Sequence, residues 1–147
     1  MNTLLHVGLD VGSTTVKIAV MDENLNTIYT NYQRHFSDTK NTVCNVLEDL
    51  INRFNNCEFT IALTGSGAMS AAKFLDLEFI QEVVSCKRAV EKYIPKTDVV
   101  IELGGEDAKI IYFDKSIEQR MNGTCAGGTG AFIDQMASLL NTDTEGL

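Results

Sequence analysis

Short apolar runs separated by polar turns open the chain and predict strands. Residues 4–10 are apolar until the run ends in an acid, and residues 16–21 form a second apolar run. The glycine and hydroxyl residues between them indicate a β-hairpin with its polar side chains at the turn. A third strand is predicted at residues 27–32. The chain therefore begins with three strands in succession.

Helical spacing follows these strands. Apolar residues recur at three- and four-residue intervals from Val43 to Phe54, and Asp38 and Thr39 are candidate caps upstream. Pro95, the single proline, ends a later helical pattern. Between these points the pattern predicts a strand, a helix, a strand and a helix, at residues 59–63, 68–75, 79–84 and 85–94.

Strands that alternate with helices predict an α/β fold. This order favours a mixed, largely parallel sheet with flanking helices and an antiparallel hairpin at one side. We expect residues 1–96 to form a first domain of this kind. A second apolar hairpin follows at residues 98–113, with one helical pattern after it. Residues 97–147 are therefore expected to form only the beginning of a second such domain.

The two hairpins share a pattern that we interpret as a weak internal repeat. Each has an apolar strand, an acid, a glycine-containing turn and a lysine, Lys17 or Lys109, in the returning strand. Glycines let the backbone approach phosphate oxygens, hydroxyls donate hydrogen bonds, and carboxylates hold Mg²⁺ through its waters. Two such turns facing one cleft would suit a nucleotide. Neither turn matches a P-loop or precedes a helix, which disfavours a P-loop or Rossmann site.

Cys125 stands in a glycine-rich turn just before a helical pattern. The apolar residues of that pattern include Phe132 and Met136, whose spacing indicates a partly buried helix. A helix N-terminus favours the thiolate, the form that attacks electrophiles and binds metals. The structural alternative is a small buried hydrophobic residue. The remaining cysteines are far apart and form no C-x-x-C pair, which argues against a disulfide framework: Cys44, Cys57 and Cys86.

Composition narrows the possible partners. The 147 residues are 44% hydrophobic and 22% charged, as in ordinary globular proteins, and the net charge is −8. An acidic chain without a lysine and arginine cluster argues against binding to nucleic acid or an anionic membrane. No basic leader is visible, and no apolar run approaches the roughly 20 residues of a membrane span. We expect a cytoplasmic protein.

Three motifs together resemble a known family. Residues 8–17, 101–109 and 121–137 look like the ATP-dependent activators of 2-hydroxyacyl-CoA dehydratases, relatives of the ATPase subunits of benzoyl-CoA reductase. The third motif is specific to them, whereas the first two are shared with the actin-like ATPase and sugar-kinase superfamily. The resemblance implies ribonuclease-H-like domains, ATP with Mg²⁺ in the interdomain cleft, and a homodimer sharing one 4Fe–4S cluster. It also implies ATP-driven electron transfer from a donor such as ferredoxin or flavodoxin to a CoA-ester dehydratase or reductase.

The resemblance assigns roles to residues of the first hairpin and of the cluster motif. Asp10 would organise the waters of Mg²⁺, and Cys125 would ligate the cluster. Lys17 is either a phosphate contact or a solvated lysine at a strand end. The first phosphate loop would consist of Gly12, Ser13, Thr14 and Thr15.

The resemblance also assigns roles to three acids and a glycine pair further along the chain. Glu102 stands where superfamily members often have aspartate, and Glu106 where many activators have glutamine. Gly104 and Gly105 would meet the phosphates. Glu82 either positions a water or is simply an acid favoured at a helix N-terminus.

Two alternative functions stay open. A sugar or N-acyl-hexosamine kinase of the same fold would use a carboxylate as the base on a sugar hydroxyl. This alternative gives no reason for Cys125 in a glycine turn. The other is a nucleotide-binding regulatory module without redox chemistry. The resemblance further implies a second cluster cysteine and an adenine-binding half that these residues lack, so we expect the chain by itself to be impaired.

Overall fold

The computed structural model describes residues 3–113, 117–122 and 129–147. The chain divides into two compact units, Met1–Glu82 (unit 1) and Val83–Leu147 (unit 2), and each is described by itself. The domain boundary expected between residues 96 and 97 stays a prediction. Within the described ranges no helix is long and apolar enough to cross a membrane.

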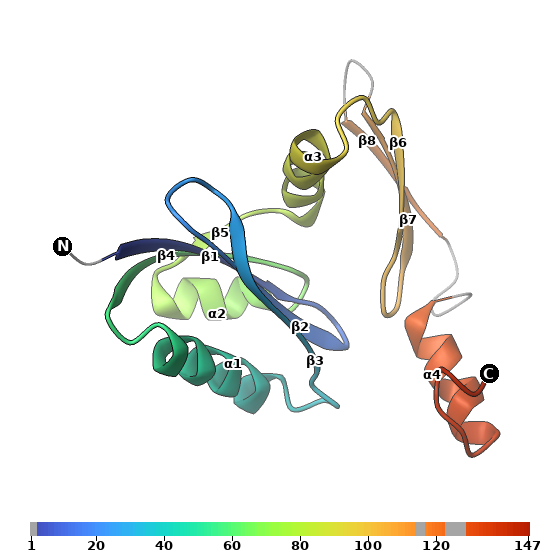
Figure 1. The fold of residues 1–147 in the computed structure, drawn as a ribbon. Helices are drawn as coiled ribbons and strands as arrows, with labels where there is room; N and C mark the ends of the chain where they lie inside the picture. Colours follow the sequence, from blue (N-terminus) through green and yellow to red (C-terminus); the bar gives the residue numbers. More distant parts are fainter. Residues whose placement is uncertain (1–2, 114–116, 123–128) are drawn as a thin grey trace. The chain divides into compact units, whose positions relative to one another are not determined.

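Unit 1 is built on a mixed sheet. Its strands are β1 (Thr3–Val11), β2 (Thr15–Met21), β3 (Thr27–Arg34), β4 (Cys57–Thr64) and β5 (Glu78–Phe79). The five strands, which Figure 1 labels, lie in the order β3-β2-β1-β4-β5. β1 pairs antiparallel with β2 and parallel with β4. The predicted combination of a parallel pair and an antiparallel hairpin at one side is confirmed.

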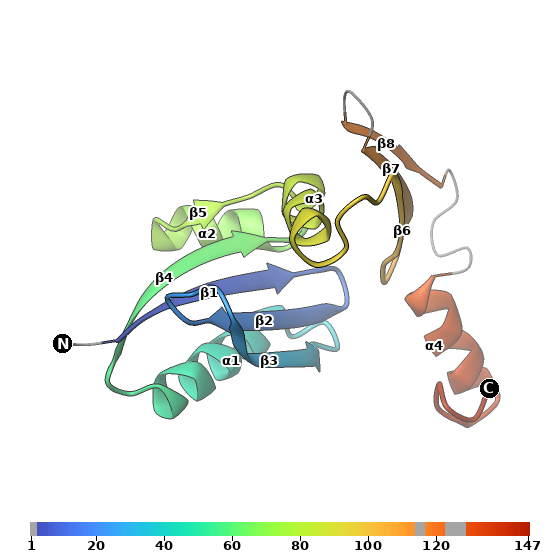
Figure 2. The same cartoon turned by 45° about the horizontal axis from the view of Figure 1, so that its top comes forward.

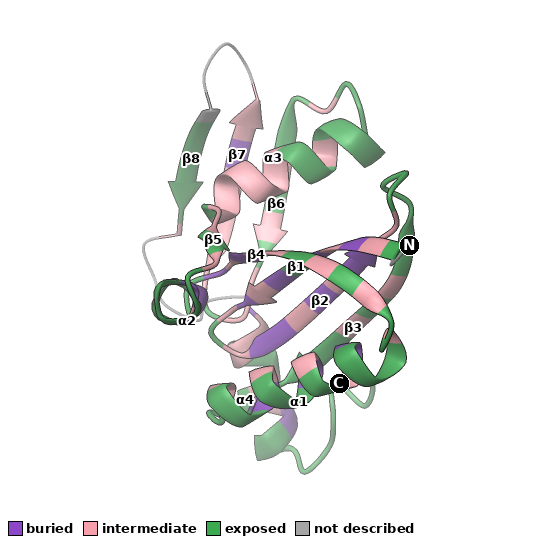
Figure 3. Cartoon of the chain, turned by 90° about the vertical axis from the view of Figure 1, so that its left-hand side faces the viewer, coloured by how far each residue is buried: buried purple, intermediate pink, exposed green. Residues whose placement is uncertain are grey.

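One face of the unit 1 sheet carries its core. Side chains alternate along a strand, so every second residue of β1 and β2 faces the same way. Figure 3 shows this alternation as a banding of buried and partly exposed residues. Helices α1 (Thr39–Arg53) and α2 (Ala68–Leu75) pack on the sheet, α1 on β2 and β3 and α2 on β4 and β5, as Figures 1 and 2 show. The core consists of Leu5, Val7, Leu9, Val11, Val16, Ile18, Val20, Val46, Leu50, Leu63, Ala68 and Ala72.

The predicted helix cap is present at the start of α1. Asp38 is the N-cap residue, and its carboxylate accepts a hydrogen bond from the Asn41 amide at 3.4 Å. Thr42, Val46 and Leu50, four residues apart, are the buried positions of the helix. Ile51, which the apolar pattern also includes, is 56% exposed. The pattern therefore predicts the helix correctly and makes its buried face one residue too wide.

Unit 2 contains a second antiparallel hairpin followed by a third strand. Helix α3 (Glu82–Tyr93) leads into β6 (Val99–Leu103), β7 (Ala108–Phe113) and β8 (Ile117–Met121), which form a sheet in that order. Both neighbouring pairs are antiparallel. Helix α4 (Gly130–Leu139) follows, with Ala137 buried and Phe132 44% exposed. The predicted hairpin and the predicted partly buried helix are confirmed.

Two predicted boundaries are wrong, and one strand was missed. Residues 79–84 are not a strand, because β5 ends at Phe79 and the chain turns into α3 at Glu82. Only the Ile80 amide extends the pairing, to the Leu63 carbonyl at 2.8 Å, and β4 itself ends at Thr64. The β-branched residues there favour a strand, but tertiary pairing decides the outcome. Strand β8 was missed because Glu118, Gln119 and Arg120 interrupt any apolar alternation.

We predict that Leu50→Ala destabilises unit 1 strongly and that Ile51→Ala does not. Leu50 is 1% exposed within the core, so its truncation should lower the free energy of unfolding by about 2–5 kcal/mol. The adjacent exposed Ile51 should change it by less than about 0.5 kcal/mol. Urea unfolding followed by circular dichroism measures both. Equal effects of the two variants would contradict the core described here.

Candidate functional site

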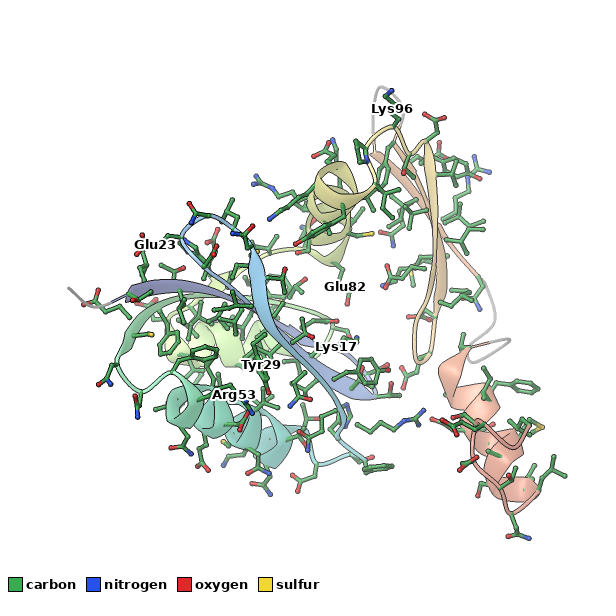
Figure 4. All side chains as sticks on the ribbon, viewed as in Figure 1. Lys17, Glu23, Tyr29, Arg53, Glu82 and Lys96 are labelled. Atoms are coloured by element: carbon green, nitrogen blue, oxygen red, sulfur yellow. The ribbon has the colours of Figure 1, made fainter. Side chains whose placement is uncertain are left out.

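The β1–β2 hairpin brings an acid and a lysine together beside its turn. Asp10 and Lys17 are cross-strand partners, and Lys17 Nζ donates to Asp10 Oδ2 at 2.8 Å. The two side chains are 34% and 40% exposed, so the pair adds little stability and stays open to exchange. The same ammonium lies 5.7 Å from the centre of the Tyr32 ring. Figure 4 labels Lys17 at this end of the hairpin.

The turn itself is closed by backbone bonds and held from one side by a histidine. The Gly12 amide donates to the Thr15 carbonyl at 2.9 Å, and Ser13 lies exposed between them. His35 is buried, and its Nδ1 accepts from the Ser37 amide at 3.1 Å. Its Nε2 therefore carries the proton and donates to the Gly12 carbonyl at 3.2 Å. Sequence reasoning missed His35, since nothing in the pattern after β3 marks it.

A second loop of unit 1 lies directly against Asp10. Thr64, the last residue of β4, is the parallel partner of Asp10 on β1. The loop that follows β4 is therefore placed beside the β1–β2 turn. The Gly67 amide donates to the Val11 carbonyl at 2.8 Å. Gly65 is buried with a φ of +100°, and an added Cβ there would lie 2.5 Å from Asp10 Oδ1.

Unit 2 repeats the acid–lysine arrangement in its own hairpin. Glu102 and Lys109 are cross-strand partners, with Lys109 Nζ 3.8 Å from Glu102 Oε1. The Gly104 amide closes the turn on the Asp107 carbonyl at 2.8 Å, as the Gly12 amide does in unit 1. Lys109 is only 13% exposed, against 40% for Lys17. The predicted internal repeat thus extends to strand pairing and turn closure.

Helix α4 begins against the β6–β7 turn. The Gly130 amide donates to the Gly104 carbonyl at 3.1 Å, and the Ala131 amide to the Gly105 carbonyl at 2.7 Å. Thr129, the N-cap residue, is 1% exposed, and its hydroxyl has no hydrogen-bond partner in the structure described. Cys125 lies outside the described residues. The structure therefore gives the start of α4 but not the surroundings of the predicted cluster ligand.

Two further acids of the predicted site, Glu82 and Glu106, lie at a helix start and in a turn. Glu82 is the first residue of α3, where the helix dipole favours an acid. Glu106 is exposed in the β6–β7 turn. Within the described ranges, no group of three or more histidines, cysteines or acids is arranged to hold a metal ion. Cys57 is the first residue of β4.

Cys86 on α3 has an environment unsuited to a reactive thiol. Burial raises the pKa of its thiol, the charge of Glu102 raises this pKa further, and Lys109 opposes both. Cys44, by contrast, is exposed on α1. The thiolate of Cys86 is therefore disfavoured near neutral pH.

Comparison with known protein families gives a match over nearly the whole chain. Residues 7–147 match the model of the BadF/BadG/BcrA/BcrD ATPase family. The chain is 30% identical over 148 residues to the 2-hydroxyisocaproyl-CoA dehydratase activator of Clostridioides difficile. It is 29% identical over 151 residues to the (R)-2-hydroxyglutaryl-CoA dehydratase activating ATPase of Acidaminococcus fermentans. These alignments cover 96% and 99% of the chain but 54% and 57% of the relatives, so the chain spans about half their length.

Solved structures confirm the predicted fold. The activator of 2-hydroxyisocaproyl-CoA dehydratase from Clostridium difficile with bound ADPNP matches with a TM-score of 0.80 and 28% identity, over 95% of this chain and 53% of that one. Component A of (R)-2-hydroxyglutaryl-CoA dehydratase from Acidaminococcus fermentans matches with a TM-score of 0.81 and 21% identity, over 97% and 56%. The second match shows the fold alone. The chain has an actin-like ATPase fold.

We predict that Cys86 reacts with iodoacetamide more slowly than Cys44 at pH 8. The raised pKa leaves less Cys86 thiolate, and removing the Glu102 charge should lower that pKa and speed the reaction. Peptide-resolved mass spectrometry of wild-type protein and Glu102→Gln measures both rates, with Cys44 as the internal control. An unchanged ratio of the two rates in Glu102→Gln would contradict the assigned environment.

Proposed function

The chain belongs to the BadF/BadG/BcrA/BcrD ATPase family, and we propose that it takes part in the ATP-dependent activation of a CoA-ester dehydratase or reductase. Relatives named as dehydratase activators and activating ATPases support this proposal. The observation that carries it is the repeated hairpin, in which an acid and a lysine pair across the strands beside a glycine turn. Each turn is a proposed phosphate-binding turn of its own unit.

Asp10 is the proposed holder of the divalent cation. Its carboxylate already accepts one cationic group, the Lys17 ammonium, and the side chain is accessible. A carboxylate in such a position fits Mg²⁺, which would neutralise phosphate charge during hydrolysis. Lys17 Nζ lies 3.8 Å from the point where a Cβ on Gly12 would be, so the ammonium lies close to the turn. We propose that Lys17 passes from Asp10 to a phosphate oxygen when nucleotide binds.

The remaining predicted contacts belong to the same proposal. Gly12, Ser13, Thr14 and Thr15 would supply backbone and hydroxyl donors to the phosphates. In the β6–β7 turn, the phosphates would be bound by Gly104, Gly105 and Glu106. Glu102 stands there in place of the aspartate common in the superfamily. Glu82 is kept as a candidate for positioning the attacking water. Amide and hydroxyl donors suit phosphate oxygens, and carboxylate oxygens suit Mg²⁺.

Electron transfer is the finer part of the proposal. We propose that Cys125 ligates a 4Fe–4S cluster shared across a homodimer, and that the electron comes from a ferredoxin- or flavodoxin-like donor. Thiolate is the usual ligand of such clusters. The unpartnered Thr129 hydroxyl at the start of α4, shortly after Cys125 in the sequence, supports a bound group near this point. The cytoplasmic location expected from the sequence stays a prediction.

We predict that Asp10→Asn abolishes Mg²⁺-dependent ATP turnover, because it removes the charge that holds the cation. Glu48→Gln is the matched control, since Glu48 is exposed on α1 and loses the same charge in the same unit. Phosphate release is measured with each variant at several Mg²⁺ concentrations. Wild-type turnover in Asp10→Asn would remove Asp10 from the site.

We predict that Cys125→Ala, made in a protein that also supplies the second cluster cysteine, loses the cluster after anaerobic reconstitution with iron and sulfide. Cys44→Ala is the control, because Cys44 lies exposed on α1 in unit 1. Visible absorbance and electron paramagnetic resonance report the cluster in each variant. The same cluster signals in Cys125→Ala as in wild-type protein would contradict the assignment.

A further inference from the structure

The loop after β4 is used by none of the roles assigned so far. It consists of Gly65, Ser66 and Gly67, and the sequence marks it only as a glycine-containing turn before α2. The parallel register of β1 and β4 brings it to the β1–β2 turn. The Gly67 amide joins it to β1 by a bond to the Val11 carbonyl at 2.8 Å, and the Ala68 amide closes the loop internally on the Gly65 carbonyl at 3.1 Å.

Gly65 is the residue of this loop that meets Asp10. Its φ of +100° is a conformation that residues with a side chain rarely adopt. An added Cβ would meet the carbonyl oxygen of Val11 and would lie 2.5 Å from Asp10 Oδ1. Both contacts are closer than van der Waals distance. The Asp10 carboxylate therefore occupies space that exists only because position 65 has no side chain.

The two carboxylate oxygens of Asp10 have different neighbours. Oδ2 accepts the Lys17 ammonium at 2.8 Å, while Oδ1 lies against the Gly65 backbone. Asp10 itself sits near the end of β1, whose register with β2 and β4 is fixed along the whole strand. The strand register fixes the Asp10 backbone, the Lys17 ammonium bonds one carboxylate oxygen, and the Gly65 backbone limits the space open to the other. Such preorganisation is what a cation ligand needs.

We propose that Gly65 is a positioning residue, which sets the orientation of the Asp10 carboxylate toward a divalent cation by leaving room for Oδ1. This inference rests on the proposed function of Asp10 and adds the β4–α2 loop to the same site. Gly65 touches neither the cation nor the nucleotide. Any side chain at position 65 displaces Oδ1, and the carboxylate then turns away from the cation.

The chain offers a matched control within the same loop. Gly67 has an ordinary helical conformation, with φ of −88° and ψ of −10°. An added Cβ there would lie 3.1 Å from Val11 Cγ1 and 3.2 Å from the Val11 carbonyl, and no Asp10 atom is among its nearest neighbours. Gly67→Ala therefore disturbs the packing on Val11 without reaching the carboxylate.

The test measures Mn²⁺ binding by electron paramagnetic resonance, with ADPNP present and no turnover. Gly65→Ala should weaken Mn²⁺ affinity by about 10-fold or more, as changes behind a metal ligand commonly do, whereas Gly67→Ala should change it by less than about 2-fold. Asp10→Asn is measured alongside. Equal losses in the two glycine variants, or none in Gly65→Ala, would overturn the proposal.

Thermal unfolding of Gly65→Ala, Asp10→Ala and the double variant separates this inference from the proposed function. Removing the carboxylate relieves one of the two close contacts, so the double variant should lose less stability than the sum of the single variants. Gly67→Ala combined with Asp10→Ala should be additive. If Asp10→Asn binds Mn²⁺ normally, the proposed function fails; additivity of the Gly65 and Asp10 changes makes the inference fail independently.

Gly65→Asn replaces Gly65→Ala if the alanine variant does not fold. Asparagine tolerates positive φ better than alanine does, while its Cβ meets the same Asp10 oxygen. The expected loss of Mn²⁺ affinity is the same. If neither variant folds while Gly67→Ala does, Gly65 is required for the backbone conformation alone, and the proposal is overturned.

Discussion

The antiparallel register of β1 and β2 is the constraint on which the candidate site depends. It places Asp10 opposite Lys17, and on the other face of the same strands it places Leu9, Val11, Val16 and Ile18 in the core. Because side chains alternate along a strand, a slip by one residue would exchange the two faces. The burial of four apolar side chains therefore also holds the acid and the lysine in place. The charged pair is partly exposed on both side chains, so it does not itself need to stabilise the register.

The hairpin of unit 2 pairs its acid and lysine in the same register, but its lysine is less exposed. Glu102 faces Lys109, but this lysine is 13% exposed and its ammonium is 3.8 Å from the carboxylate. A lysine that is largely covered exchanges partners less readily than Lys17, whose side chain is 40% exposed. Turn closure also differs in its surroundings, since the carbonyls of Gly104 and Gly105 accept the first amides of α4. Both hairpins thus pair an acid with a lysine across the strands, and the lysine of the first hairpin, Lys17, is the one that exchanges partners more readily.

Local patterns predicted the elements that local interactions decide. Both hairpins, the Asp38 cap of α1 and the bounds of α2 follow from apolar spacing, cap chemistry and turn residues, and all are present. The end of β5, the start of α3 and the strand β8 were not predicted, because each depends on where a neighbouring strand ends or offers an edge. In the site, Asp10, Lys17 and the turn glycines were visible as a motif. His35 and Gly65 were not, since their contacts with the β1–β2 turn arise only from tertiary packing.

The parallel pairing of β1 with β4 explains why a distant glycine reaches Asp10. Parallel strands end at the same edge of a sheet, and the loops that leave their carboxyl ends meet there. Asp10 and Thr64 are the last pair of this ladder, so the β1–β2 turn and the β4–α2 loop begin side by side. The hairpin alone supplies the charges, but it leaves the carboxylate free to rotate. In our proposal the β4–α2 loop limits that freedom. The parallel pairing of β1 with β4, which β2, β3 and α1 separate in the sequence, makes the two loops neighbours. The site is therefore a property of the whole sheet of unit 1 rather than of its most recognisable motif.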